Sequence, residues 1–357
     1  MKLLVILSLL FFSLNALAQE EDHEHFETRG ALDIRLPLDF EDSSDNLLNV
    51  QAAELVIQGP INNQFSGLIN LTAHGHEDDF KPELHEAYVA SKHLIPSSKV
   101  KIGKFLLDVG GLNNTHPHDW FFTSAPKVHT DFFSEEGLND TGVEYTFLQS
   151  DVKNTFSFSA GVTNGYHFGH THEESGEESA EERPHVPTHY VHPSKQFFSE
   201  NGFIKFGATY VGRTDSRGIQ TQIYGLDFTK LAGEKAKPQF LIKSEILYRN
   251  LSTPGFSATE EVGAYLYSER LLNETWSAGI RADLFSELSR TQEADLSKKE
   301  NLNYALTPSM IYRTGESSIL RFNYTYQVQT NQGENDQLNQ KLELQLVAYL
   351  GDHYHED

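Results

Sequence analysis

Histidines and acidic residues gather at several points of this chain in patterns that suit a divalent cation. The chain has 17 histidines and no cysteine, so a metal site would have to use nitrogen and oxygen ligands. Where two histidines stand two residues apart in an extended segment, both rings project to the same side. The candidate ligands are His74 and His76; His116, His118, Asp119 and His129; His167, His170 and His172; and His353 and His355.

Most of these clusters admit two interpretations. Flexible tracts of histidine and acid would capture ions loosely, because ordering the chain costs conformational entropy. The same composition would also suit a solvated acidic surface with no ligand role. For the pairs near the two chain ends, His23/His25 and His353/His355, neither interpretation is favoured.

The segment 110–141 differs because it carries apolar residues of its own. Trp120, Phe121 and Phe122 stand close to the histidine pair at 116 and 118, and such a loop is expected to pack rather than extend into solvent. If it folds into a barrel, its histidines and acids would line a constriction that selects for cations. The alternative is a loop that only shapes the pore.

The charge and composition limit the classes of partner and activity. The chain has 51 acidic and 28 basic residues, for a formal net charge of −23, which opposes nucleic acid and favours cations. No G-x-S-x-G elbow or paired-carboxylate site stands out, so we do not expect an enzyme. No obligatory cofactor is expected either; Zn²⁺ or a related divalent cation would be transported or loosely bound.

The first residues have the features of a secretory signal peptide over 1–18. Lys2 precedes an apolar stretch that ends near Leu14, and a cleavage motif follows at 16–18. No later segment offers about 18 consecutive apolar residues, as a transmembrane helix would need. We expect an acidic tail with histidines over 19–30, a barrel over 31–350 and a histidine-containing tail over 351–357.

Alternation of apolar and polar residues with a period of two is the main signal of fold. In 321–329, Phe322 and Tyr324 fall on one face, while Arg321 and Asn323 fall on the other. Similar segments recur along the chain at the length of a tilted, membrane-crossing strand. With the export signal, they predict an all-β chain, a transmembrane antiparallel β-barrel in the bacterial outer membrane that contacts lipid and lipopolysaccharide. A soluble β-sandwich is the alternative.

The strand count follows from parity. About 15 segments are visible, whereas single-chain bacterial barrels close with an even number of strands. Counting from both ends places a hidden strand within 185–196, so we expect about 16 strands, within a range of about 14 to 18. The long outer loops are expected at 74–83, 110–141, 164–185, 286–302 and 330–339.

Three short stretches resemble the zinc-regulated outer-membrane protein family, a porin-like group distantly similar to phosphate-selective porins and often mislabelled as TonB-dependent receptors. They are Gly103-Lys-Phe with Gly110-Gly-Leu-Asn-Asn-Thr-His-Pro-His-Asp119, then Phe133-Ser-Glu-Glu-Gly-Leu-Asn-Asp-Thr-Gly-Val143, and Leu350-Gly-Asp-His-Tyr-His355. The resemblance implies a trimeric or monomeric outer-membrane channel linked to zinc supply. The chain departs from the family in a shortened, acidic region at 173–200 and in an ending without an aromatic residue.

These observations lead to a functional hypothesis. We expect an outer-membrane channel that gathers zinc-like divalent cations at loops rich in histidine and acid and passes them through an acidic lumen, as a homotrimer or alone. A general porin, selective for cations or anions and with incidental histidines, is an alternative, as is a surface scaffold barrel. A ladder of lysines and arginines in the lumen would favour an anion porin.

Overall fold

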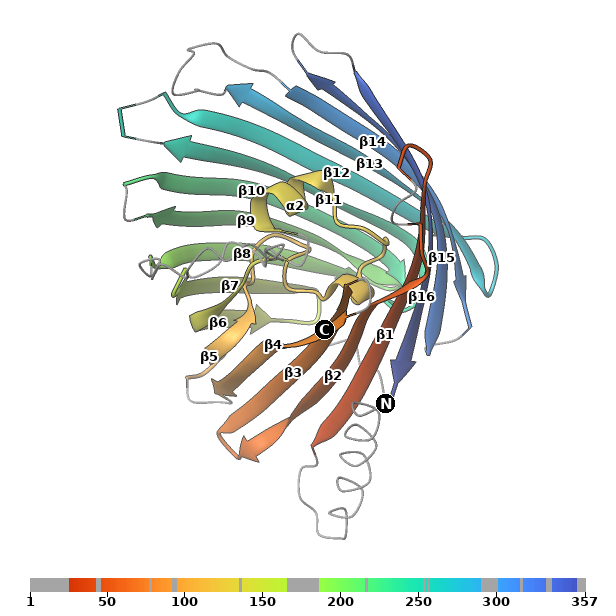
Figure 1. Cartoon of the computed structure of the whole chain (residues 1–357). Helices are drawn as coiled ribbons and strands as arrows, with labels where there is room; N and C mark the ends of the chain where they lie inside the picture. The colour runs from red at the N-terminus through yellow and green to blue at the C-terminus, as the bar shows by residue number, and fades with distance from the viewer. Residues whose placement is uncertain are drawn as a thin grey trace.

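The chain forms a closed barrel of 16 antiparallel strands, in which every strand pairs with its neighbours in sequence and the first pairs with the last (Figure 1). The predicted fold class and strand number are therefore confirmed. The computed structural model describes residues 26–42, 46–76, 79–91, 95–134, 137–165, 186–215, 218–252, 254–255, 257–289, 301–314, 317–331 and 336–351.

The strands run in chain order around the barrel and are 9 to 15 residues long. Two short helical elements lie between the fifth and sixth strands: η1 (Pro117–Asp119) and α2 (Lys127–Phe133). The strands are β1 (Glu27–Asp39), β2 (Asn49–Asn62), β3 (Phe65–His76), β4 (Asp79–Ser91), β5 (Ser98–Leu106), β6 (Asn139–Ser150), β7 (Asn154–Thr163), β8 (Thr188–Ser199), β9 (Gly202–Thr214), β10 (Gln220–Gly233), β11 (Pro238–Ser252), β12 (Thr259–Leu271), β13 (Trp276–Ser289), β14 (Asn301–Arg313), β15 (Ser318–Asn331) and β16 (Gln337–Leu350).

The barrel wall has a polar inside and an apolar outside. On β13, Arg281 and Asp283 are buried towards the lumen, whereas Ile280 and Leu284 are exposed. Side chains of successive strand residues point to opposite faces, so one alternating sequence supplies both surfaces. This is the arrangement of a barrel whose outer surface meets lipid. Among the described residues, no helix is long and apolar enough to cross a membrane.

The strand predicted from parity is present. β8 pairs with β7 on one side and with β9 on the other, over the region where the sequence showed only weak alternation. The alternation is weak because a barrel strand should be polar on its buried inner face and apolar outside. Here the exposed His189 is at least as polar as the buried Tyr190 and His192. Closure of the sheet therefore revealed a strand that local pattern did not.

Several predicted boundaries are wrong by a few residues. The outer loop expected at 74–83 is mostly strand, because β3 continues to His76 and β4 begins at Asp79. Histidine and acidic residues are common in loops, but they also suit the inner face of a water-filled barrel. In the same way β1 begins at Glu27, inside the expected tail 19–30, β13 extends to Ser289, and β15 and β16 shorten the loop expected at 330–339.

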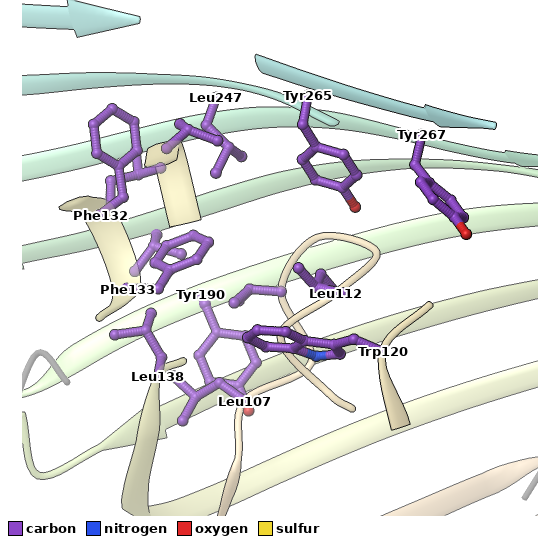
Figure 2. Close-up of a cluster of buried hydrophobic side chains, with 14 of the residues drawn as sticks. Leu107, Leu112, Trp120, Phe132, Phe133, Leu138, Tyr190, Leu247, Tyr265 and Tyr267 are labelled. Carbon is purple, nitrogen blue, oxygen red and sulfur yellow. The ribbon is translucent and has the colours of Figure 1, made fainter. Parts of the chain in front are cut away.

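The connection between β5 and β6, residues 107–138, folds into the barrel and is called the inner loop below (Figure 1). It packs there, as the sequence predicts, by means of an apolar cluster that joins it to the barrel wall (Figure 2). The inner loop contributes Leu107, Leu112, Trp120, Phe132, Phe133 and Leu138, and strands β8, β11 and β12 contribute Tyr190, Leu247, Tyr265 and Tyr267. Because this cluster fills the β8–β12 side of the lumen, α2 and η1 are held inside the barrel.

Candidate functional site: a histidine and acid cluster in the lumen

The start of the inner loop is fixed to the wall by hydrogen bonds from its backbone. Gly110 N–H donates to Thr209 Oγ1 at 2.7 Å, and Gly111 N–H donates to Glu245 Oε1 at 2.5 Å. Gly110 has a positive φ of 65°, and a Cβ there would lie 2.1 Å from Glu245 Oε1. Only glycine fits both the backbone conformation and this close approach.

A histidine between two aspartates completes this attachment. His192 Nδ1 lies 3.1 Å from Asp108 Oδ1, and its Nε2 lies 3.1 Å from Asp227 Oδ2. Burial would raise the pKa of Asp108, but the hydrogen bond and charge of His192 outweigh it, with help from Ser159, and the pKa falls to about 2. The inner loop is therefore joined to β8 and β10 through an ionised Asp108.

Arginines of the wall hold the far part of the inner loop by its backbone carbonyls. A carbonyl is a neutral acceptor, so the guanidinium charges need further partners, and two of them have carboxylates: Glu261 beside Arg249 and Asp283 beside Arg281. The three contacts are Arg249 with the Asp131 carbonyl at 2.6 Å, Arg281 with the Ser124 carbonyl, and Arg321 with the Trp120 carbonyl at 2.6 Å. These arginines on β11, β13 and β15 are called the arginine wall.

Four histidines form a continuous row that runs from β3 and β4 into the inner loop, called the histidine cluster. The ring centroids of His74 and His85 are 5.4 Å apart, those of His85 and His116 are 5.5 Å apart, and those of His116 and His118 are 5.8 Å apart. His74 belongs to β3 and His85 to β4, whereas His116 and His118 come from the inner loop. The row therefore runs from near the long-loop end of the barrel to the inner loop.

A β-bulge explains how β4 supplies two adjacent residues to this site. The register of β3 and β4 shifts between Asn70 and Leu71, so Asn70 faces Glu86 while Leu71 faces Leu84. His85 is the extra residue, and both His85 and Glu86 are buried. A bulge re-aims side chains in this way, which strict alternation would not allow.

Three carboxylates surround the inner-loop end of the row. Glu86 Oε1 lies 3.0 Å from His116 Nε2, and Glu54 Oε2 lies 3.4 Å from His116 Nδ1. Asp119 Oδ2 and Glu54 Oε1 lie 3.6 and 3.7 Å from His118 Nε2. Burial lowers the pKa of His116, but Glu54 and Glu86 outweigh it and raise the pKa to about 10. The imidazolium of His116 thus lies between the carboxylates of Glu54 and Glu86 at neutral pH.

A cavity of about 490 Å³ adjoins the histidine cluster. Glu54, Glu86, His116 and His118 line it, together with basic residues of other strands. No group of three or more His, Asp or Glu side chains within the described ranges is already arranged to hold one metal ion. With ring centroids more than 5 Å apart, the cluster offers a succession of ligands rather than a preformed tetrahedral site.

The structure brings together four of the residues that the sequence singled out: His74, His116, His118 and Asp119. His129 does not join them. It is fully buried in α2, its ring packs against Trp120 and Phe133, and burial lowers its pKa to about 3. The remaining candidates lie outside the described residues: the side chain of His76, and His167, His170, His172, His353 and His355.

Sequence reasoning missed three members of the site: Glu54, His85 and Glu86. Alternation in the predicted strand 49–58 gives a signal for Glu54, because a lone acid in an apolar segment belongs on the inner face. His85 and Glu86 are adjacent, and only the bulge places both inside. Their relation to His116, some 30 residues later, depends on how the inner loop folds.

Comparison with solved structures shows the fold of outer-membrane porins. The anion-selective porin from Comamonas acidovorans has a TM-score of 0.62 at 8% identity, with 92% of this chain and 100% of that chain covered. The channel DcaP of Acinetobacter baumannii has a TM-score of 0.58 at 9% identity, covering 93% and 99%. OprB of Pseudomonas putida has a TM-score of 0.58 at 8% identity, covering 92% and 94%. The chain folds as an outer-membrane porin-type barrel.

Comparison of sequences adds less. No known protein-family profile matches the chain. A protein of Aquifex aeolicus, described as uncharacterized, is 28% identical over 262 residues, which are 67% of this chain and 55% of that protein. The chain thus spans about half the length of this curated relative.

Proposed function

We propose that the protein is an outer-membrane channel of the porin type that selects for cations at the histidine cluster. The observation that carries the proposal is the gathering of three carboxylates at the inner-loop end of the histidine cluster, beside the cavity. A confined site of low dielectric strengthens such selection. The likeness to porin structures supports a channel, and the apolar outer wall supports an outer-membrane location.

We further propose that zinc or a similar divalent cation is the ion that this site favours. Carboxylate oxygen and neutral imidazole nitrogen form a donor set for such ions, so an ion bound at His116 would displace the proton that this ring carries. A row of separate ligands would bind each ion weakly enough to release it to the next position, which conduction requires. The ion is cargo in this proposal, not a resident cofactor.

Zinc block of ion current tests this proposal. In planar bilayers, the full chain should conduct potassium in preference to chloride, and micromolar zinc should reduce the current. Replacing His116 and His118 by glutamine should weaken the block by about tenfold, since two ligands are lost. His189→Gln is the matched control, because this histidine of β8 is exposed on the outer wall. Equal zinc block in all three proteins, or none in any, would refute the cation site.

A general porin selective for anions is the competing function, and the basic residues that line the cavity favour it. The reversal potential in a potassium chloride gradient separates the two, because an anion porin would give the opposite sign.

A homotrimer is also part of our proposal, since a similar structure, OmpT of Vibrio cholerae, is described in a trimer form. The mass of the complex in detergent tests it.

A further inference from the structure

Two arginines lie side by side on the cavity wall. Arg313 on β14 pairs in register with Ile319, and Arg321 on β15 pairs with Ile311, so the two arginines occupy diagonal positions on the inner face. Both line the cavity and both are at least nine-tenths buried. Among the described residues, the Nε atom of each guanidinium is buried and has no hydrogen-bond acceptor.

The charges of this pair are only partly compensated. Arg313 forms an ion pair with Glu269 at 2.7 Å and donates to Ser277 Oγ at 3.0 Å. Arg321 donates to Gln345 Oε1 at 2.7 Å and to the Trp120 carbonyl at 2.6 Å, and both acceptors are neutral. Burying a charge is costly unless an opposite charge accompanies it. Asp33, the carboxylate whose charge acts on Arg321, is itself ion-paired with Arg35, so the described residues give Arg321 no carboxylate of its own.

The arginine pair lies close to the histidine cluster. Three consecutive residues, the last two of η1 and the one that follows, connect them. His118 faces Glu54, and Asp119 accepts a hydrogen bond from Tyr349 at 3.0 Å. The carbonyl of the next residue, Trp120, accepts from Arg321. The cavity is lined by both groups. One small molecule in this cavity could therefore contact guanidinium groups at one end and imidazole and carboxylate groups at the other.

We propose that Arg313 and Arg321 form an anion subsite, and that the cargo is a divalent cation carried by a small carboxylate chelator. The carboxylates would lie on the two guanidinium groups, whose planar arrays of N–H donors match carboxylate oxygens. The cation would face His116 and His118. A volume of about 490 Å³ is ample for a molecule of that size. The cation half of this inference rests on the function proposed above.

Citrate, zinc sulfate and zinc citrate are the probes for this inference. With the full chain in planar bilayers, each probe is titrated and the concentration that halves the potassium current is measured. Citrate alone should block through the anion subsite, and zinc citrate should block at a concentration about tenfold lower, because it contacts both ends of the cavity. A channel indifferent to citrate, free or zinc-bound, would overturn the anion subsite.

A paired substitution locates the effect. Arg313→Gln together with Glu269→Gln removes both charges of one ion pair and leaves groups that can still hydrogen bond. It should raise the half-blocking concentration of citrate about tenfold and leave the block by zinc alone unchanged. The matched control is Lys341→Gln with Glu343→Gln, an ion pair of 3.0 Å on β16 that does not line the cavity. Equal citrate block in the variant and the control would overturn the assignment.

The outcomes separate the two proposals. Citrate block without zinc block would refute the cation site, and with it the chelate, while the anion subsite would stand. Zinc block without citrate block would refute the anion subsite, and with it the chelate, while the cation site would stand. If the paired variant does not insert, Arg313→Lys retains the charge but not the fork of donors, and it should weaken citrate block as well. Unchanged citrate block in that variant would refute the role of Arg313.

Discussion

The two sides of the lumen hold the same inner loop but use charge in opposite ways. On the arginine wall, guanidinium groups bind backbone carbonyls of the loop, and Glu261 and Asp283 balance two of the charges. On the other side, the contact is made by a side chain, His116, which meets more carboxylates than its single charge can balance. The first arrangement fixes the loop in place, and the second leaves carboxylates of the histidine cluster on the wall of the cavity.

This difference between the two sides explains why a count of the charges in the lumen does not reveal the ion selectivity. The lumen contains arginines that a general porin could use as a ladder for anions, but those of the arginine wall already bind the inner loop. Arg321 is the exception among them, because its acceptors are neutral. The charges that remain available to a passing ion are those that the fold itself does not neutralise.

Removing Arg321 should produce the largest effect, because it removes one of the contacts that fix the inner loop to the arginine wall. Arg321→Ala would leave Gln345 Oε1 and the Trp120 carbonyl without their donor. We expect the free energy of unfolding to fall by about 3 kcal/mol, since hydrogen bonds to charged groups are worth more than neutral ones. Urea titration in detergent micelles measures this loss, and single-channel conductance should rise as the loop loosens. A conductance and a stability equal to those of the original chain would contradict the role of Arg321 in holding the inner loop.

A rise in pH should weaken the ion pairs of His116, with a smaller effect on stability than the loss of Arg321. The pKa of His116 is raised from 6.5 to about 10, so its ion pairs stabilise the folded chain fully below pH 6.5 and are lost as pH rises towards 10. The full shift corresponds to about 5 kcal/mol, but solvent in the adjoining cavity screens these ion pairs, so the stability advantage of the original chain over His116→Gln should shrink by about 1 to 2 kcal/mol across this range. Urea titrations of both proteins at several pH values measure it. An advantage that grows with pH would show that the sign is wrong.

The sequence was sufficient for the wall of the barrel but only partly for the site. Alternation as strict as that of 321–329 determines which face of a strand meets the lumen, and sheet closure requires the weak strand β8. His116 and His118 could be identified because both lie in one short motif. Glu54 and Glu86 come from β2 and β4, and their approach to His116 depends on the path of the inner loop through the lumen. No local pattern contains that information.

The smallest expected effect concerns His129, which the sequence grouped with His116 and the structure places apart. Its ring lies between Trp120 and Phe133, and burial keeps it neutral by lowering its pKa to about 3. His129→Phe would keep the edge-to-face ring contacts and remove two buried nitrogen atoms, so the free energy of unfolding should change by less than about 1.5 kcal/mol. Zinc block should stay at the level of the original chain, in contrast to the variant of His116 and His118. A loss of zinc block on this substitution would mean that the aromatic side of the inner loop also takes part in binding the ion, and the division of the lumen into a structural and a selective side would no longer hold.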